Sequence, residues 1–182
     1  MNKFYDLVNR RYSVRKYKNI PVERDKIIAC IESAHIAPSA CNSQPWEFIV
    51  VDDSETKDEL IEKTCSGVYS MNSFAKEAPV VIAVLSDRGK ISSRFGGMIR
   101  HTKFDLIDIG ISIEHFILQA TEFGLGTCII GWFDEKRARK ILSVDDRKKV
   151  LLLLTLGWSN EKKGVKRLRK PIDKIYSFLS KI

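Results

Sequence analysis

The chain has 182 residues, which is enough for one sizeable domain and short for two. A hydrophobic fraction of 44% and a charged fraction of 30% are ordinary for a soluble globular protein and argue against a disordered chain. No apolar run approaches the roughly 18 residues that a membrane span needs, and the first residues lack the apolar core of a signal peptide. We therefore expect a cytoplasmic protein with no membrane partner.

The net charge of +8 comes largely from two basic clusters, one near each end of the chain. They comprise Arg10, Arg11, Arg15, Lys16 and Lys18 at one end and Lys162, Lys163, Lys166, Arg167, Arg169 and Lys170 at the other. Two such clusters can converge on one polyanion, either a nucleic acid or the phosphate of a cofactor. The four cysteines and three histidines match no metal-binding spacing, so we expect mostly buried free thiols and no metal.

The first half of the chain predicts alternating helices and strands. The predicted elements are helices over residues 3–10, 23–35 and 54–64, an extended segment over 11–18, a polar loop over 39–45, and strands over 47–51 and 80–85. Apolar residues in the second helix recur at helical spacing, as at Ile27 and Ile31. Both strands are continuous apolar runs, which is typical of strands buried on both faces. Ser54 is the expected N-cap of the third helix.

The second half is dominated by one long apolar helix. The predicted elements are a glycine-rich loop or lid over residues 87–97, helices over 100–123 and 134–142, and strands over 127–130 and 150–156, with Gly124 and Asp134 as helix caps. Apolar side chains surround nearly the whole circumference of the long helix, which indicates burial. Since it would span roughly 35 Å at 1.5 Å per residue, a small domain can hardly bury it alone. We therefore expect this helix to form a dimer interface.

Arg11, Ser13 and Arg15 are the first candidate ligand-binding residues. In an extended chain alternate side chains point the same way, so these three share a face with Tyr17. Two guanidinium groups that flank a hydroxyl suit a phosphate, because arginine offers forked donors that match phosphate oxygens. A solvated basic strand is the alternative interpretation of this segment by itself.

The loop from Pro38 to Trp46 is the second candidate. Asn42 and Gln44 offer both donor and acceptor amides, which suit the heteroatom edge of an isoalloxazine ring. Pro38 and Pro45 restrict the backbone and so lower the ordering cost of binding. The alternative is an ordinary polar loop with Trp46 packed in the core.

In their order along the chain, these motifs resemble the nitroreductase family of flavoproteins. The family's opening Arg-x-Ser-x-Arg/Lys matches Arg11 to Arg15, and its Pro-Ser-x-x-Asn-x-Gln-Pro-Trp loop matches Pro38 to Trp46. A Gly-Leu-Gly-Thr strand entry at 124–127 leads to Ile130-Gly131, where family members place backbone beside the reactive flavin nitrogen. Two arginines before Pro171 complete the set, so the resemblance covers nearly the whole chain.

The resemblance implies a single α+β domain over residues 1–182. The expected fold is a three-layer α/β/α sandwich around a mixed, mainly antiparallel sheet, with a domain-swapped C-terminal extension. It further implies FMN bound at the interface of a homodimer. The residues carried over as cofactor-binding are Arg11, Tyr12, Ser13, Arg15, Pro38, Ser39, Ala40, Asn42, Gln44, Ile130, Gly131, Arg167 and Arg169. Pro38 and Ser39 would reach the flavin from the partner subunit, and Cys41 would lie close to it.

The implied activity is hydride transfer from NADH or NADPH, through FMN, to an electron-poor acceptor such as a nitroaromatic or a quinone, in a ping-pong cycle. We expect no catalytic side chain and no metal, because the flavin carries the chemistry. A dehalogenating or flavin-fragmenting enzyme, a flavin-binding regulator without turnover and a basic nucleic-acid-binding module remain as alternatives. No nucleic-acid-binding motif is present, so we expect a small-molecule partner. The glycines at 124–127 lack the third glycine of a dinucleotide fingerprint and precede a strand, which speaks against a Rossmann dehydrogenase.

Overall fold

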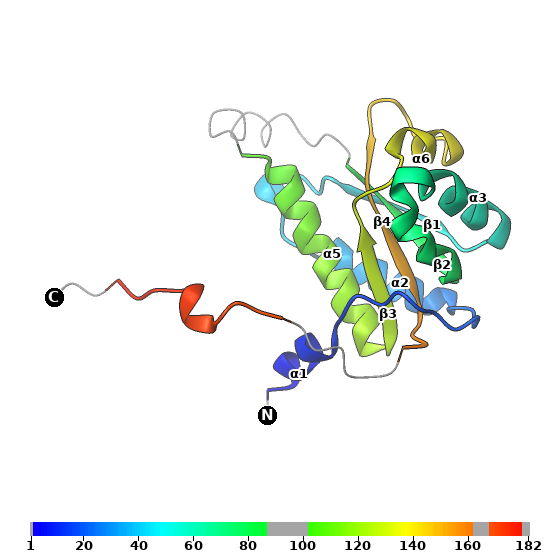
Figure 1. Cartoon of the computed structure of the whole chain (residues 1–182). Helices are drawn as coiled ribbons and strands as arrows, with labels where there is room; N and C mark the ends of the chain where they lie inside the picture. Colours follow the sequence, from blue (N-terminus) through cyan, green and yellow to red (C-terminus); the bar gives the residue numbers. More distant parts are fainter. Residues whose placement is uncertain (1, 87–101, 162–167, 180–182) are drawn as a thin grey trace.

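Four antiparallel strands form the central sheet of the computed structural model, which describes residues 2–86, 102–161 and 168–179 (Figure 1). The strands are β1 (Trp46–Val51), β2 (Val80–Ser86), β3 (Leu125–Ile130) and β4 (Lys149–Trp158), in the spatial order β1-β2-β4-β3. β2 is buried along its whole length, as its continuous apolar run predicted. A parallel bridge between Ser13 and Thr127 adds to the outer edge of β3, so the sheet is mixed but mainly antiparallel.

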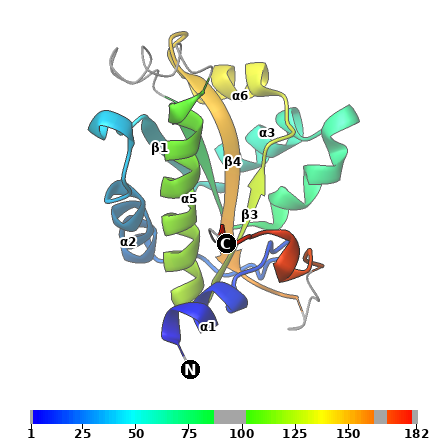
Figure 2. The same cartoon turned by 90° about the vertical axis from the view of Figure 1, so that its left-hand side faces the viewer.

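Helices cover both faces of this sheet (Figures 1 and 2). One layer contains α2 (Arg24–His35) and α5 (Phe104–Glu122), and the other contains α3 (Ser54–Thr64), the 3₁₀ segment η2 (Gly67–Glu77) and α6 (Glu135–Ile141). Successive residues of β2 face alternate layers, because side chains alternate along a strand: Ile82 and Val84 pack with α5, and Val81 and Ala83 pack with α3. The predicted α+β, three-layer sandwich is therefore confirmed.

α5 is buried more deeply within one chain than we expected. Its residues Ile109, Phe116 and Ile117 lie in the core, packed against α2 and the sheet. Leu106 and Ile107, near its N-terminal end, stay 39% and 51% exposed. The helix therefore has one fully packed face and a partly apolar outer face, rather than a circumference that needs a partner everywhere.

The remaining predicted elements are confirmed within two to four residues at their ends, with one correction at α3. α1 (Lys3–Arg10), α2 and α6 lie where expected, and the expected caps Gly124 (φ 78°) and Asp134 end α5 and begin α6. The N-cap of α3 is Asp53 and not Ser54, since the Asp53 carboxylate accepts from the Thr56 amide at 2.8 Å. Both are good capping residues, so the sequence does not separate them. The predicted lid over 87–97 lies outside the described residues.

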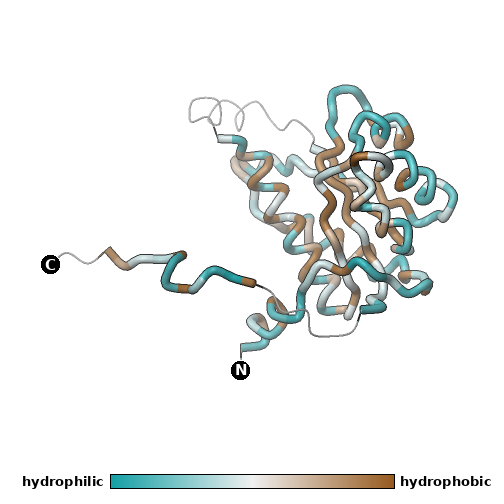
Figure 3. The backbone as a smooth tube through the Cα atoms, viewed as in Figure 1, coloured by the Kyte–Doolittle hydropathy of each residue, from teal (hydrophilic) through white to brown (hydrophobic). Residues whose placement is uncertain are grey.

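Residues 168–179 lead away from the body of the molecule (Figure 1) and include the short 3₁₀ segment η3 (Ile172–Lys174). Apolar residues recur along this segment (Figure 3), and Phe178 and Leu179 are 87% and 102% exposed. Solvent-exposed apolar side chains in series are typical of a segment that packs against another chain. Within the described part of the chain, no helix is both long and apolar enough to cross a membrane.

Candidate functional site

The segment after α1 lies along the edge of β3 and is held there by its backbone. The Val14 amide donates to the Thr127 carbonyl oxygen at 2.9 Å. Val14 is buried and Arg15 is exposed, while Arg11 and Ser13 are half-buried. The close approach depends on the glycine at position 126, since a Cβ there would lie 2.4 Å from Val14 Cγ2.

Tyr17 does not share a face with Arg15, contrary to the expected alternation. It is 5% exposed, and its hydroxyl donates to the Val14 carbonyl oxygen at 2.7 Å and lies 2.6 Å from Thr155 Oγ1. Burial raises the pKa of Tyr17 above its ordinary value, and the Thr155 hydrogen bond lowers it by less. Tyr17 therefore anchors the segment in the core and is not a ligand-binding residue.

Arg11, Ser13 and Arg15 gather around the thiol of Cys128 on β3. Burial raises the pKa of Cys128, and the negative charge of Glu161 adds to this, while the charges of Arg15 and Arg11 and a hydrogen bond from Ser13 lower it. The predicted triad is therefore brought together, with Cys128 at its base. Sequence reasoning missed Cys128, although its place next to Thr127 was the available signal. Beside the triad, Tyr12 shares a hydrogen bond of 2.9 Å with Ser159.

Ile130 and Gly131 end β3 at an open surface. The side chain of Ile130 is buried, so only its backbone is available to a ligand. Gly131 is exposed, and a Cβ built on it would meet nothing within 4 Å. Next to them Trp132 is 58% exposed, with its ring 5.3 Å from that of Tyr69 and its indole nitrogen donating to the Val68 carbonyl oxygen at 3.3 Å. The backbone at Gly131 therefore faces free space beside a fixed aromatic residue that was not predicted.

The loop after α2 has an unusual backbone. Cys41, Asn42 and Gln44 have positive φ angles of 54°, 51° and 46°, a region that residues other than glycine adopt at a cost of about 1–3 kcal/mol each. Two hydrogen bonds close the loop: the Gln44 backbone amide donates to Ser39 Oγ at 3.0 Å, and the side-chain Nε2 of Gln44 donates to Asn42 Oδ1 at 3.1 Å. Such backbone conformations cluster at binding sites, where the surrounding structure enforces them. Pro38 is exposed, and Ala40 donates its amide to Asp108.

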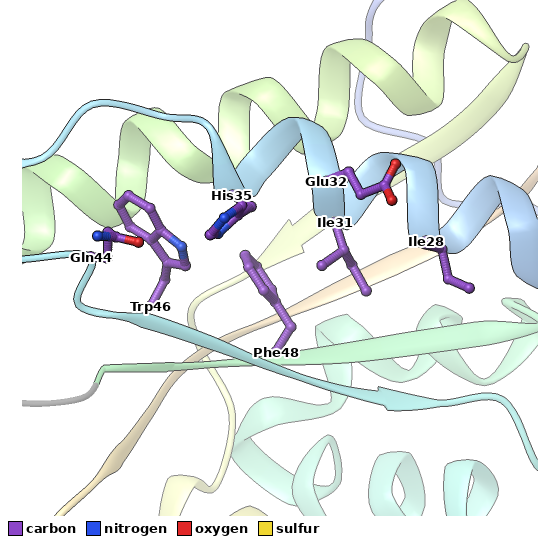
Figure 4. A pocket seen from close by; sticks show the side chains of 7 residues that line it. All are labelled: Ile28, Ile31, Glu32, His35, Gln44, Trp46 and Phe48. Atoms are coloured by element: carbon purple, nitrogen blue, oxygen red, sulfur yellow. The ribbon is translucent and has the colours of Figure 1, made fainter.

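A pocket of ≈ 420 Å³ lies behind this loop, between α2 and β1 (Figure 4). Its lining residues are Ile28, Ile31, Glu32, His35, Gln44, Trp46 and Phe48. Trp46, which the alternative interpretation of the loop placed in the core, is half-buried, packs against the core cluster and points into this pocket beside Gln44. The pocket was not predicted.

The segment with Arg11, Ser13 and Arg15 and the loop after α2 lie at opposite ends of α5. Ala40 contacts Asp108 near the start of this helix, whereas Arg10 pairs with Glu122 at its end, at 2.6 Å. Fourteen residues of helix separate these contacts, or about 21 Å at 1.5 Å per residue. One protomer therefore does not bring Arg11 and the loop together. Arg169 lies on the outward-leading segment and donates to the Leu168 carbonyl oxygen, and Arg167 lies outside the described residues.

The donor set fits flavin mononucleotide. The guanidinium groups of Arg11 and Arg15 and the hydroxyl of Ser13 can bind a phosphate and its polyol chain. The unobstructed backbone at Gly131 leaves room for a planar ring at the end of β3. The amide groups of Asn42 and Gln44 can serve the polar edge of such a ring, although here they hydrogen-bond to each other.

Comparison with known proteins agrees with this geometry. The family model described as "Nitroreductase family" matches residues 8–70 and 66–158. The Streptococcus pyogenes protein Spy0809, whose name describes an NAD(P)H nitroreductase, is 28% identical over 95% of this chain and 98% of its own. An iodotyrosine deiodinase from Thermotoga neapolitana is 23% identical, over 90% and 92%. The structure of an FMN-dependent nitroreductase from Clostridium difficile superposes with a TM-score of 0.74 at 29% identity, over 94% and 96%. The chain belongs to the nitroreductase family.

Proposed function

We propose that this protein is an FMN-dependent oxidoreductase that passes hydride from NADH or NADPH to an electron-poor acceptor such as a nitroaromatic or a quinone. The observation that carries the proposal is the gathering of Arg11, Ser13 and Arg15 around Cys128 on the strand that ends at the open backbone of Gly131. Family membership and the name of the Clostridium difficile protein support the choice of FMN. When bound, FMN supplies the hydride chemistry, and the chain binds and orients it.

In this proposal each protomer contributes to two flavin sites. Arg11, Tyr12, Ser13 and Arg15 would hold the phosphate, ribityl chain and pyrimidine edge, and the backbone of 130–131 would face the ring. The loop that contributes Pro38, Ser39, Ala40, Asn42 and Gln44 would serve the flavin of the second subunit, because within its own chain its contact with Asp108 and the contact of Arg10 with Glu122 lie about 21 Å apart along α5. From the family motif, Arg169 and Arg167, the latter outside the described residues, would complete the phosphate site. The cationic Arg15 and the backbone at 130–131 would favour negative charge on a ring bound there.

The colour of the purified protein tests the cofactor. We expect a yellow protein whose flavin absorbance bleaches with NADH or NADPH in the absence of oxygen and returns when a quinone or nitroaromatic is added. FMN at 100 times its dissociation constant should add about 2.7 kcal/mol of stability, which raises the melting temperature by about 5–10 °C in a chain of this size. A protein that saturating FMN neither colours nor stabilises would show that the proposal is wrong.

The homodimer has its own test in the C-terminal segment. Ile175 and Phe178 are 63% and 87% exposed. Changing both to serine should weaken dimerisation by at least about tenfold if their apolar surface packs on the second subunit. Sedimentation measures the dimer dissociation constant. Ile20→Ser, at a residue that is 47% exposed on the body, is the matched control and should leave it unchanged. Equal dimer constants in both variants would contradict this arrangement.

A dehalogenating enzyme is the second candidate, because the Thermotoga neapolitana relative is named as an iodotyrosine deiodinase. It would use the same flavin and the same nicotinamide donor. A panel of nitroaromatics, quinones and halogenated phenols, each assayed with NADH and NADPH, separates the two candidates. Halide release as the fastest reaction would favour the second.

A further inference from the structure

α5 carries a polar stripe on the face that meets α2 and the loop after it. The residues of this stripe are Asp108, Ser112, His115 and Gln119. Ser112 Oγ donates to the Ala34 carbonyl oxygen at 2.9 Å, and His115 Nδ1 lies 3.2 Å from the Ser33 carbonyl oxygen. These contacts, and that of Gln119 with the Ser33 hydroxyl at 3.1 Å, join the helix to α2. Asp108 differs from the others, because its contacts are with the loop.

Asp108 is 4% exposed, and one of its carboxylate oxygens serves two loop residues. Oδ2 accepts from the Ala40 amide at 3.0 Å and lies 3.5 Å from Ser43 Oγ. Ala40 and Ser43 flank Cys41 and Asn42, two of the three loop residues with positive φ. A buried carboxylate is unfavourable unless its hydrogen bonds repay its lost hydration, so its presence on a largely apolar helix indicates a specific role. The contacts of Asp108 bracket the part of the loop that is hardest to hold.

We propose that Asp108 is a positioning residue for the cofactor site: it holds the loop of residues 39–44 in the shape that meets the flavin of the second subunit. The inference rests on the proposed function. Without the carboxylate oxygen, the Ala40 amide loses its partner, and Cys41 and Asn42 are free to relax to more favourable backbone angles. FMN would then have to order the loop on binding, which lowers its affinity.

Two substitutions at one position isolate this role. Because Ala40 and Ser43 both contact Oδ2, the amide oxygen of asparagine can replace it, whereas alanine cannot. We expect Asp108→Ala to weaken FMN binding by about tenfold or more and Asp108→Asn to stay within about threefold of the unaltered protein. If the alanine variant does not fold, Asp108→Ser can replace it, because the serine side chain is too short to accept from the Ala40 amide.

Ser112→Ala is the matched control. It removes a buried side-chain hydrogen bond from the same stripe, one helical turn further on, but the lost partner is Ala34 on α2 and not the loop. It should lower the melting temperature and leave FMN affinity unchanged. If Ser112→Ala and Asp108→Ala weaken FMN binding equally, the effect is general destabilisation and the inference fails.

Cys41 provides a second readout within the loop itself. It is the exposed one of the four cysteines, and Cys30, Cys65 and Cys128 are buried, so a maleimide reagent should label it selectively in the folded protein. Saturating FMN should slow this labelling in the unaltered protein and in Asp108→Asn by about tenfold, and much less in Asp108→Ala. Equal protection of Cys41 and equal FMN affinity in all folded Asp108 variants would overturn the inference. A parent protein that binds no FMN would instead disprove the proposed function.

Discussion

Replacing Arg11 and Arg15 together by glutamine is expected to weaken FMN binding by at least about 100-fold while the protein stays folded. Each guanidinium offers forked donors to phosphate oxygens, and a hydrogen bond between charged partners contributes about 1.5–3 kcal/mol. Two such losses amount to about 3–6 kcal/mol, or roughly 100-fold to 10,000-fold in affinity. We take the lower limit, because Arg15 is exposed and water weakens its charge interactions.

Quenching of FMN fluorescence during titration of the apoprotein measures this affinity. A second signature is its dependence on salt: binding to the unaltered protein should weaken as ionic strength rises, and binding to the double variant should do so much less. The matched control is the pair Arg24→Gln and Arg147→Gln, which removes the same charge. These arginines pair with Asp52 and Asp145 at 2.8 and 2.9 Å.

If the FMN affinity of the Arg11 and Arg15 variant changes by less than about threefold, the phosphate does not bind at this position. The same conclusion would follow if the control pair weakened FMN as strongly, since the effect would then come from net charge alone.

The elements of the fold could be predicted because their signals are local. The strands β1 and β2 are continuous apolar runs, and α2 shows a helical stripe of apolar residues. The expected burial on both faces holds for β2 but not for β1, which lies at the edge of the sheet and is mostly half-buried. The depth of α5 could not be predicted in the same way. Its apolar circumference shows that it is buried, but not whether its own chain or a second one covers each side, which depends on the packing of α2 and the sheet.

The site was predicted through motifs, which identify residues and not their contacts. Arg11, Ser13 and Arg15 do gather, yet the alternation rule misplaced Tyr17, because the segment leaves regular strand geometry and buries both Val14 and Tyr17. The contact between Asp108 and Ala40 joins residues 68 apart in the chain, so no local pattern records it. The positive φ angles of the loop were hidden too, since none of the three residues is a glycine.

Gly126→Ala is expected to damage both the fold and the cofactor site. The added Cβ would lie 2.4 Å from Val14 Cγ2 and 2.9 Å from Val14 Cβ, distances that real side chains do not adopt. The segment that contains Val14 must therefore move away from β3. This disturbs the 2.9 Å hydrogen bond from the Val14 amide to the Thr127 carbonyl oxygen and shifts Ser13 as well. Overpacking of this kind costs about 1–3 kcal/mol, or about 3–10 °C in melting temperature for a chain of this size.

Gly131→Ala separates the two consequences, because a Cβ at that position meets nothing within 4 Å. We expect it to leave the melting temperature of the apoprotein unchanged and to weaken FMN binding, since the backbone there lies against the flavin in the proposed site. Gly126→Ala should lower both quantities, the affinity by about tenfold if the triad is displaced as a unit. An apoprotein as stable as the parent would contradict the predicted clash.

Val14→Ala tests whether the clash is the cause. In the Gly126→Ala background it removes the Cγ atoms that lie 2.4 and 3.1 Å from the new Cβ and leaves only the 2.9 Å contact with Val14 Cβ. The double variant should therefore recover much of the FMN affinity, although Val14→Ala alone costs stability by opening a cavity in the core. A coupling between the two sites is the expected result of a double-mutant cycle. Strictly additive losses would mean that Gly126 supports the triad in some way other than by admitting Val14 to the edge of β3.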